Sequence, residues 1–457
     1  MIKRTLAQLK DMIQIENDIT AFQDIAINGV SIDSRKIAKG NLFVPFKGEH
    51  SDGHRFVEEA LKTGAHAALW QKDVPNPPLH LPILIVEDTL TALQELARGY
   101  RNQLDVKVVG ITGSNGKTTV KDMVTKLLSL QYKVQKTEGN YNNHIGLPLT
   151  VLSLAEDTEI AVLEMGMSSK GEIDFLSTLA RPNAAIITNI GESHLQDLGS
   201  REGIAEAKLE ITHGLQENGL IVYLGDEPLL QERLQDDKGN ALIQTFGRND
   251  GNDIYPLEIK TDSSGSMFKT NLSQTVFKLP VLGIHNILNA LCAMLTANYF
   301  QIPYSKMNEG FSGLKLTNMR MELVEGQNAV KVINDAYNAS PTSMRAAIEL
   351  VSALSGFSQK ILVLGDMLEL GEREQEFHYE MGKSIDPQTV DYVFTFGDLG
   401  RYISEGAKTV LNENRVFSFA EKESLIAELK KILTADALVL VKASRGMRME
   451  EVVKALI

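Results

Sequence analysis

The segment 108–120, VVGITGSNGKTTV, constrains the fold of this chain more than any other part of the sequence. Its apolar first half predicts a buried strand, its middle is a glycine-containing turn, and the periodicity that follows predicts a helix. In such a turn the backbone N–H groups and the N-terminus of the helix face the same side and bind phosphate groups. The segment therefore predicts an α/β domain with a phosphate-binding loop.

The residue types of the loop favour a nucleoside triphosphate with Mg²⁺. Lys117 is expected to reach the terminal phosphates, and the Thr118 hydroxyl is expected to ligate the metal. The loop departs from the general pattern, because Ile111 stands where that pattern has its first glycine. A glycine turn that only happens to precede a helix is the alternative. The residues expected around the phosphates are Gly113, Ser114, Asn115, Gly116, Lys117, Thr118 and Thr119.

The rest of the chain divides into three units, as its 457 residues lead one to expect at roughly 100–200 residues per domain. Residues 1–103 predict a small mixed α/β domain. Residues 104–316 predict a mostly parallel sheet with helices on both faces and an antiparallel segment at 250–280. Residues 317–457 predict a Rossmann-like α/β domain. The clearest predicted helices are 55–64, 89–103, 285–300, 341–355, 372–384, 421–433 and 447–457.

The net charge of the chain disfavours some classes of binding partner. Lys and Arg number 46 against 59 Asp and Glu, a net charge of −13, which disfavours nucleic-acid binding and anionic membranes. No apolar run approaches the ~18–20 residues that cross a bilayer, so we expect a cytoplasmic protein without membrane insertion. Cys292 is the only cysteine, which excludes an internal disulfide, and its apolar helical surroundings predict a core position.

A second candidate ligand group is Glu164, at the end of the next apolar run. The carboxyl edge of an α/β sheet is where ligands bind, and a carboxylate there suits a hard cation. A plain capping role for Glu164 is equally compatible with the sequence. Since a phosphate loop occurs in enzymes and in nucleotide switches alike, both classes stay open at this point.

Motifs spread over the whole chain resemble those of the muramyl ligases, which form amide bonds in peptidoglycan precursors at the expense of ATP. In chain order they are DSRKIAKGNLFVPFKG (33–48), DGH (52–54), TGSNGKTT (112–119), GNYNNHIGLPLTVL (139–152), LEMGMS (163–168), TNIGESHLQDLGS (188–200), AEAKLEI (205–211), GIHNILNALCA (283–293), NDAYNASPTSMRAAI (334–348), VLGDMLELGE (363–372) and KASRGMRME (442–450). The motifs of the first and third units are similar to the branch of the family that joins D-alanyl-D-alanine to UDP-N-acetylmuramoyl-tripeptide.

The resemblance implies a two-step ligation that uses ATP and two Mg²⁺ ions. The tripeptide carboxylate attacks the γ-phosphate to give an acyl phosphate and ADP, and the amine of the dipeptide then displaces phosphate. By motif position, Thr118 and Glu164 would hold the first ion, and His194 and Lys208 the second. A lysine ammonium repels Mg²⁺, so the family pattern implies that Lys208 is carbamylated. The implied catalytic residues are Lys117, Glu164, His194 and Lys208.

The resemblance also implies the contacts of the substrates. Asn286 and Asn289 would meet adenine, Arg320 the phosphates and Asp335 the ribose, so that ATP joins the second and third domains. For the UDP-sugar, the muramyl peptide and the dipeptide, the expected residues are Ser34, Arg35, Lys47, His54, Asn140, Asn142, Asn143, Asn338, Lys442, Ser444 and Arg445. The DSR and DGH motifs are also compatible with turn-capping roles.

Three alternatives remain beside this interpretation. Folylpolyglutamate synthases lack such a first domain and have a glycine after the loop lysine, where this chain has Thr118. The amino-acid-adding muramyl ligases carry a DNP-Arg-type motif that is absent here. A nucleotide switch leaves the two outer domains unexplained. The sequence does not choose between lysine and diaminopimelate as the third peptide residue, and a monomer is the expectation taken from the family.

Overall fold

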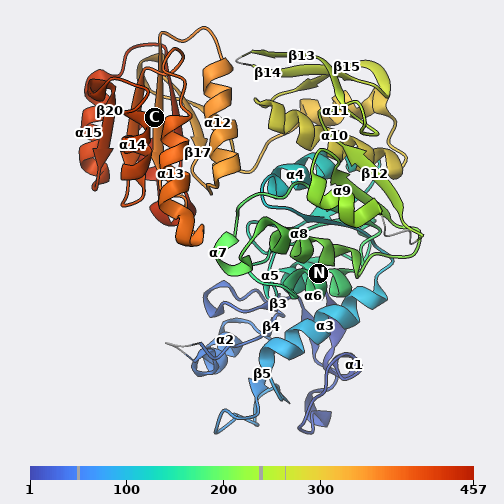
Figure 1. Cartoon of the computed structure of the whole chain (residues 1–457). Coiled ribbons are helices and arrows are strands. Elements are labelled where there is room, and N and C mark those ends of the chain that lie inside the picture. Colours follow the sequence, from blue (N-terminus) through green and yellow to red (C-terminus); the bar gives the residue numbers. More distant parts are fainter. Residues whose placement is uncertain (49–51, 236–239, 263) are drawn as a thin grey trace.

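The structure is a computed structural model that describes residues 1–48, 52–235, 240–262 and 264–457. Figure 1 shows the N-terminal part (blue) below the central part (green to yellow), with the C-terminal part (orange to red) beside it. Each part contains a sheet of parallel strands flanked by helices, so the predicted α/β class with three domains is confirmed.

The first domain contains a parallel sheet with the strand order β3-β4-β5-β6 and a small antiparallel pair, β1-β2. Its elements are β1 (Lys3–Thr5), α1 (Leu6–Leu9), β2 (Ala26–Asn28), β3 (Val30–Ser31), β4 (Leu42–Phe43), α2 (Val57–Thr63), β5 (Ala67–Gln71), β6 (Ile83–Val86) and α3 (Thr89–Gln103). The helix predicted at 89–103 is confirmed, and Asp88 caps it by accepting a 2.7 Å hydrogen bond from Thr91 N. The helix predicted at 55–64 begins with a 3₁₀ turn and continues as α2.

The first and central domains share one hydrophobic core. Helix α3 contributes Leu93 and Leu96 to a buried cluster that also contains residues of α5 (Gly146–Ser153) and α6 (Glu172–Ala180). Tyr100 Oη donates to Leu154 O at 2.9 Å, and Arg101 Nε donates to Ala180 O at 2.7 Å. The boundary predicted between residues 103 and 104 therefore falls in a continuous apolar interior.

The central sheet is entirely parallel, with the order β12-β11-β10-β7-β9-β8. Buried residues of its strands alternate between two apolar clusters, one with α4, α10 and α11 and the other with α3, α5, α6 and α8, so helices cover both faces. Its strands are β7 (Lys107–Thr112), β8 (Val134–Lys136), β9 (Ile160–Glu164), β10 (Ala184–Ile187), β11 (Leu220–Leu224) and β12 (Leu242–Phe246). Its helices are α4 (Lys117–Leu128), α5 (Gly146–Ser153), α6 (Glu172–Ala180), α7 (Leu195–Leu198), α8 (Arg201–Leu209), α9 (Pro228–Gln235), α10 (Ile284–Tyr299) and α11 (Met307–Ser312).

The antiparallel segment predicted at 250–280 is confirmed as β13 (Pro256–Asp262), β14 (Gly265–Thr270) and β15 (Ser273–Leu279), with Ser263 outside the described residues. Phe268 and Phe277 pack against each other at 5.6 Å and join the cluster of α10. Cys292 lies on α10 with no exposed surface, as predicted, and burial raises the pKa of its thiol well above the usual range.

The third domain has the strand order β16-β17-β21-β18-β19-β20, in which only β16 is antiparallel to its neighbour. Its elements are β16 (Glu322–Glu325), β17 (Lys331–Asp335), α12 (Pro341–Ala353), β18 (Gln359–Gly365), α13 (Glu374–Lys383), β19 (Tyr392–Phe396), α14 (Gly400–Ala407), β20 (Val416–Phe419), α15 (Lys422–Ile432), β21 (Ala437–Lys442) and α16 (Glu450–Leu456). Helix α14 was not predicted. It packs closely on α13 through Gly382 and Gly406, where an added Cβ would lie 1.9 Å and 2.0 Å from backbone oxygens.

Among the residues that the structure describes, no helix combines the length and apolar character needed to cross a membrane.

Candidate active site

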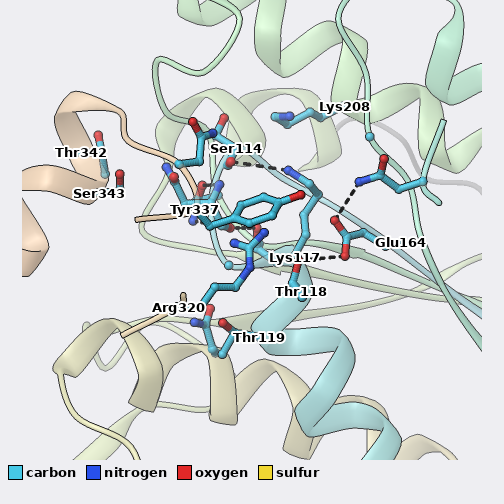
Figure 2. Close-up of a pocket in the computed structure, with 18 of the residues that line it drawn as sticks. Ser114, Lys117, Thr118, Thr119, Glu164, Lys208, Arg320, Tyr337, Thr342 and Ser343 are labelled. Carbon is cyan, nitrogen blue, oxygen red and sulfur yellow. Dashed lines mark hydrogen bonds between the residues drawn. The ribbon is translucent and has the colours of Figure 1, made fainter. Parts of the chain in front are cut away.

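A cleft of about 640 Å³ lies between the central and third domains and is lined by residues of both (Figure 2). Most of the residues predicted from the sequence to bind substrates or metal ions, or to act in catalysis, line this cleft. Those that line it are Ser114, Asn115, Gly116, Lys117, Thr118, Thr119, Asn140, Asn142, Asn143, Glu164, His194, Lys208, Asn286, Asn289, Arg320, Asp335, Asn338 and Lys442. Segments distant in the sequence therefore meet at one place.

The phosphate loop joins β7 to α4 and depends on two glycines. Gly113 has φ 144°, and a Cβ there would lie 1.8 Å from Thr188 Oγ1. Gly116 has φ 83° at the start of α4, where a Cβ would lie 2.7 Å from Asn289 Oδ1. Lys117 Nζ curls back and donates to Gly113 O at 2.7 Å. Burial lowers the pKa of Lys117, while nearby Glu164 acts in the opposite direction.

Thr118 and Glu164 form the oxygen pair that sequence analysis assigned to a metal. Thr118 Oγ1 donates to Glu164 Oε2 at 2.9 Å, and the carboxylate lies at the end of β9 with 3% of the residue exposed. Asn142 Nδ2 donates to the other oxygen, Oε1, at 2.9 Å, and Lys121 Nζ lies 3.7 Å from Oε2. The paired hydroxyl and carboxylate fit a hard cation such as Mg²⁺. In the described parts of the chain, no three His, Cys, Asp or Glu residues gather into a metal site, so any ion here relies on mixed ligands.

Lys208 projects from α8 into the cleft (Figure 2) and is 2% exposed. Its amine forms no hydrogen bond or ion pair with any residue of the described ranges. Burial lowers its pKa well below the usual range, and the charge of Lys117 adds to the effect. As an amine this group does not fit a metal site. As a carbamate it would present oxygens suited to Mg²⁺.

His194 precedes α7 with a left-handed backbone, φ 64°. Its Nδ1 lies 2.8 Å from Glu369 Oε2 of the third domain, but the contact lacks hydrogen-bond geometry. Burial lowers the pKa of His194, whereas the charge of Glu369 raises it. The imidazole thus lies at the domain interface, in the same cleft as Lys208.

Each residue expected around adenine and ribose already has a polar partner within the protein. Asn286 Nδ2 donates to Leu282 O at 2.7 Å, and Asn289 Nδ2 donates to Asn286 Oδ1 at 3.2 Å. In the third domain, Asp335 pairs with the buried amine of Lys442. Lys442 is 2% exposed, and the pairing holds it at the wall of the cleft that both residues line.

Arg320 lies in the segment between the central and third domains. Its guanidinium is stacked over the ring of Tyr337, with 4.3 Å between the guanidinium carbon and the ring centroid (Figure 2). Its Nε is buried without a hydrogen-bond partner in the described part of the chain. Arg320 therefore lines the cleft with an N–H group that is free to donate a hydrogen bond to a ligand.

His54 was expected to contact the UDP-sugar, and the structure corrects this expectation. The residue is 3% exposed, and both ring nitrogens are engaged inside the first domain. Nδ1 lies 2.6 Å from Asp52 Oδ1, Nε2 accepts from Gln71 N at 3.0 Å, and the ring packs edge-on against Trp70. His54 supports the fold, because it has no free polar atom to offer a ligand.

The other residues marked in the first domain lie outside the cleft. Arg35 has an 85% exposed side chain and forms a 2.9 Å ion pair with Asp33, which caps the 3₁₀ turn that contains Ser34. Lys47 pairs with Asp73 at 3.0 Å. The side chains of Arg35 and Lys47 are therefore both accessible to solvent.

Two residues marked in the third domain also lie outside the cleft lining. Ser444 Oγ accepts from Leu368 N at 2.9 Å and is buried. Arg445 pairs with Glu450 at 2.8 Å and has a half-exposed side chain.

Sequence analysis missed the residues that hold the two sides of the cleft together. Glu192 of the central domain accepts hydrogen bonds from Thr342 N at 3.1 Å and Thr342 Oγ1 at 2.8 Å, at the N-terminus of α12. Gln196 N donates to Glu369 O at 3.2 Å. The partners are 150 or more residues apart in sequence, so no local pattern identifies them. The quoted motifs contain all four residues.

Comparison with known proteins gives a consistent result over the whole chain. Family models described as "Mur ligase family, catalytic domain", "Mur ligase middle domain" and "Mur ligase, glutamate ligase domain" match residues 26–101, 111–297 and 319–445. A Bacillus subtilis protein named UDP-N-acetylmuramoyl-tripeptide--D-alanyl-D-alanine ligase is 51% identical over 457 residues, which cover 100% of this chain and 99% of that protein. The Escherichia coli protein of the same name is 36% identical over 463 residues, again covering 100% and 99%.

Solved structures agree with these relatives. A crystal structure of MurF from Acinetobacter baumannii superposes with a TM-score of 0.88 at 29% identity and covers 99% of this chain and 98% of that one. MurF ligase from Thermotoga maritima in complex with ADP has a TM-score of 0.83 at 30% identity, with 94% and 96% covered.

Proposed function

This chain belongs to the Mur ligase family and is an ATP-dependent ligase that adds D-alanyl-D-alanine to UDP-N-acetylmuramoyl-tripeptide, and from this premise we propose how its residues carry out the reaction. The observation that carries the proposal is the single cleft, in which the phosphate loop, Glu164 and Lys208 lie together at the boundary of two domains.

Activation of the tripeptide carboxylate is the first step. A carboxylate oxygen attacks the γ-phosphorus of ATP, the bond to the β,γ-bridging oxygen breaks, and an acyl phosphate and ADP result. Two anions must approach each other for this to happen, and Lys117 and Arg320 supply positive charge on the side of the phosphates. The loop N–H groups and the N-terminus of α4 add partial positive charge.

In the second step the uncharged amine of D-alanyl-D-alanine attacks the acyl carbon. The new C–N bond forms, the C–O bond to phosphate breaks, and the amine loses a proton. The acyl phosphate also reacts with water, so a cleft closed between two domains protects it. The Glu192–Thr342 contact is one of the bonds that would keep the cleft closed.

Thr118 and Glu164 are the proposed ligands of one Mg²⁺ ion, and His194 with carbamylated Lys208 are the proposed ligands of a second. Bound Mg²⁺ would screen the phosphate charge and polarise the phosphoryl group. Lys208 suits carbamylation because it is buried without an anionic partner in the described residues, an environment that favours the free amine. The free amine adds to CO₂ and releases a proton, which leaves an anionic carbamate.

The three predicted domains take separate substrates in this proposal: residues 1–103 the UDP-muramyl group, 104–316 ATP and 317–457 the dipeptide. The side chains proposed to contact the UDP-sugar, the muramyl peptide and the dipeptide are Ser34, Arg35, Lys47, Asn140, Asn142, Asn143, Asn338 and Arg445. Lys442, which lines the cleft beside Asp335, is proposed for the dipeptide as well, whereas Ser444, buried outside the cleft lining, would act indirectly. Asn286, Asn289 and Asp335 are proposed for adenine and ribose.

The proposal also covers the cellular compartment, the oligomeric state and the macromolecular partners of the protein. ATP and a nucleotide-linked precursor are substrates of the cytoplasm, where we place the protein, acting as a monomer without nucleic-acid or membrane partners. The net charge of −13 agrees with such partners being absent.

Phosphate release tests the proposal. The purified protein is assayed with ATP, Mg²⁺, D-alanyl-D-alanine and UDP-N-acetylmuramoyl-tripeptide, with lysine or diaminopimelate as the third residue in separate reactions. We expect release only when acid and amine are both present, and the more active tripeptide identifies the third residue. Slow ATP hydrolysis that neither substrate accelerates would instead indicate a nucleotide switch.

A further inference from the structure

The segment that connects the central and third domains is tied to the phosphate-loop helix. Asp122 lies on α4, five residues after Lys117, and is 2% exposed. Its Oδ2 accepts hydrogen bonds from Thr317 N at 2.9 Å and Thr317 Oγ1 at 2.8 Å. Its Oδ1 accepts from Lys136 Nζ at 2.7 Å. A buried carboxylate of the central domain thus fixes the connecting segment at one residue.

A second anchor follows a few residues later and belongs to the third domain. Met321 N donates to Asp335 Oδ1 at 3.1 Å, and Met319 N donates to Glu322 Oε2 at 3.1 Å. Both methionines have left-handed backbones, with φ 62° and 50°, which is uncommon for residues other than glycine. Such a backbone persists where the surrounding contacts determine it.

Arg320 lies between these anchors and lines the cleft together with the following residue, Met321. Arg320 is three positions after Thr317, and three residues span at most about 10–11 Å. The anchor at Thr317 therefore limits how far the guanidinium moves relative to α4 and its phosphate loop. Tyr337, stacked on the guanidinium, limits its orientation from the other domain.

We infer that Asp122 is a positioning residue, which acts through Thr317 to hold Arg320 against the phosphates of ATP. One helix then positions both cationic groups of the site, Lys117 through its first turn and Arg320 through its buried carboxylate. The inference rests on the proposed contact between Arg320 and ATP. If Asp122 only stabilises the fold, its loss would change unfolding without changing nucleotide affinity.

The test compares variants at Thr317, which does not face the substrates. Thr317→Val removes the hydroxyl donor and keeps the size of the side chain and the N–H, whereas Thr317→Ser keeps both donors. The dissociation constant of the non-hydrolysable analogue AMP-PNP with Mg²⁺ is measured by calorimetry, and thermal unfolding is measured in parallel. We expect about tenfold weaker binding for Thr317→Val, because small displacements of a positioned charge are costly, and wild-type binding for Thr317→Ser.

Lys136→Met is the matched control, because it removes the other partner of the same carboxylate and leaves the Thr317 hydrogen bonds in place. We expect it to change thermal unfolding and to leave the affinity for AMP-PNP unchanged. A loss of affinity equal to that of Thr317→Val would overturn the inference, because stability of the Asp122 region would then explain both results.

A double variant separates this inference from the proposed function. Arg320→Ala alone should weaken AMP-PNP binding, and adding Thr317→Val should cause no further loss, because the arginine to be positioned is gone. If Arg320→Ala leaves binding unchanged, the proposed phosphate contact is wrong and the inference falls with it. If Arg320→Ala weakens binding but Thr317→Val has no effect, or adds its full effect in the double variant, the inference alone is overturned.

Discussion

Replacing Lys208 by methionine should make the protein more stable and almost inactive. Lys208 is 2% exposed at the wall of the cleft, and its amine has no partner among the described residues, so folding removes most of its contact with water without compensation. A buried polar group left without a partner costs about 1–3 kcal/mol, and methionine fills a similar volume without that cost. We therefore expect Lys208→Met to raise the free energy of unfolding by up to about 1–3 kcal/mol. Loss of a charge-stabilising ligand group should lower kcat about 10²–10³-fold or more.

Lys121 is the matched comparison for this prediction. It is as deeply buried as Lys208, on a helix that lines the same cleft, but its amine lies 3.7 Å from the carboxylate of Glu164. Lys121→Met removes the cation that lies 3.7 Å from that carboxylate, so it should lower the free energy of unfolding by about 1–3 kcal/mol. The same substitution at two equally buried lysines should thus have opposite effects on stability.

Both variants are followed by urea titration in buffer freed of CO₂ and Mg²⁺, so that Lys208 of the wild type carries its amine. Turnover is measured separately by phosphate release at saturating ATP with bicarbonate present. A Lys208→Met protein that unfolds at lower urea than the wild type would refute the argument that the amine is uncompensated. Near-normal turnover of the same variant would refute the carbamate assignment.

Three further outcomes follow from contacts described above. Glu164→Gln should keep the fold but lower kcat about 10²–10³-fold. Calorimetric titration of Mg²⁺ in the presence of AMP-PNP should show weaker metal binding by this variant, and an unchanged titration would exclude a ligand role for Glu164. Glu192→Ala, which breaks the contact with Thr342, should enlarge the radius of gyration measured by X-ray scattering without changing the unfolding midpoint, and identical scattering curves would contradict this role. Burial lowers the pKa of His378, whose Nε2 accepts a hydrogen bond from Met367 N, so the unfolded state binds a proton more readily than the folded state does. The free energy of unfolding should therefore fall as the pH drops below about 6.5, by at most about 1.4 kcal/mol per pH unit. Urea titrations at several pH values should show a smaller fall for His378→Gln.

Local patterns predicted most of the architecture correctly. The runs that became β9 and β11 and the helical stretch that became α3 carry their signals within a few residues, in apolar periodicity and in the Asp88 cap. Helix α14 contains two glycines, which lower helix propensity, and one of them, Gly406, is required by the close contact with Tyr379 of α13. Long-range packing overrode the local preference there.

The site was less predictable, because its chemistry depends on distance and burial. Lys117 and Thr118 carry a local motif, but Lys208 is one helical lysine among many until the fold buries it, and only the family resemblance identified it. For the DGH motif the sequence left a ligand contact and a turn-capping role open, and the structure shows the capping role: Asp52 caps the 3₁₀ turn that contains His54, and His54 is a packed core residue. Asp122 gave no sequence signal, since its partner Thr317 is 195 residues away.

The buried position of Cys292 gives this protein a practical advantage for observing domain motion. Because the only thiol of the chain is fully enclosed in α10 and its pKa is raised well above the usual range, maleimide dyes should leave the native protein unlabelled. A pair of cysteines introduced at exposed positions, one on α3 and one on α15, would then be the sole labelling sites. Energy transfer between two dyes on single molecules would follow the opening and closing of the cleft directly during turnover.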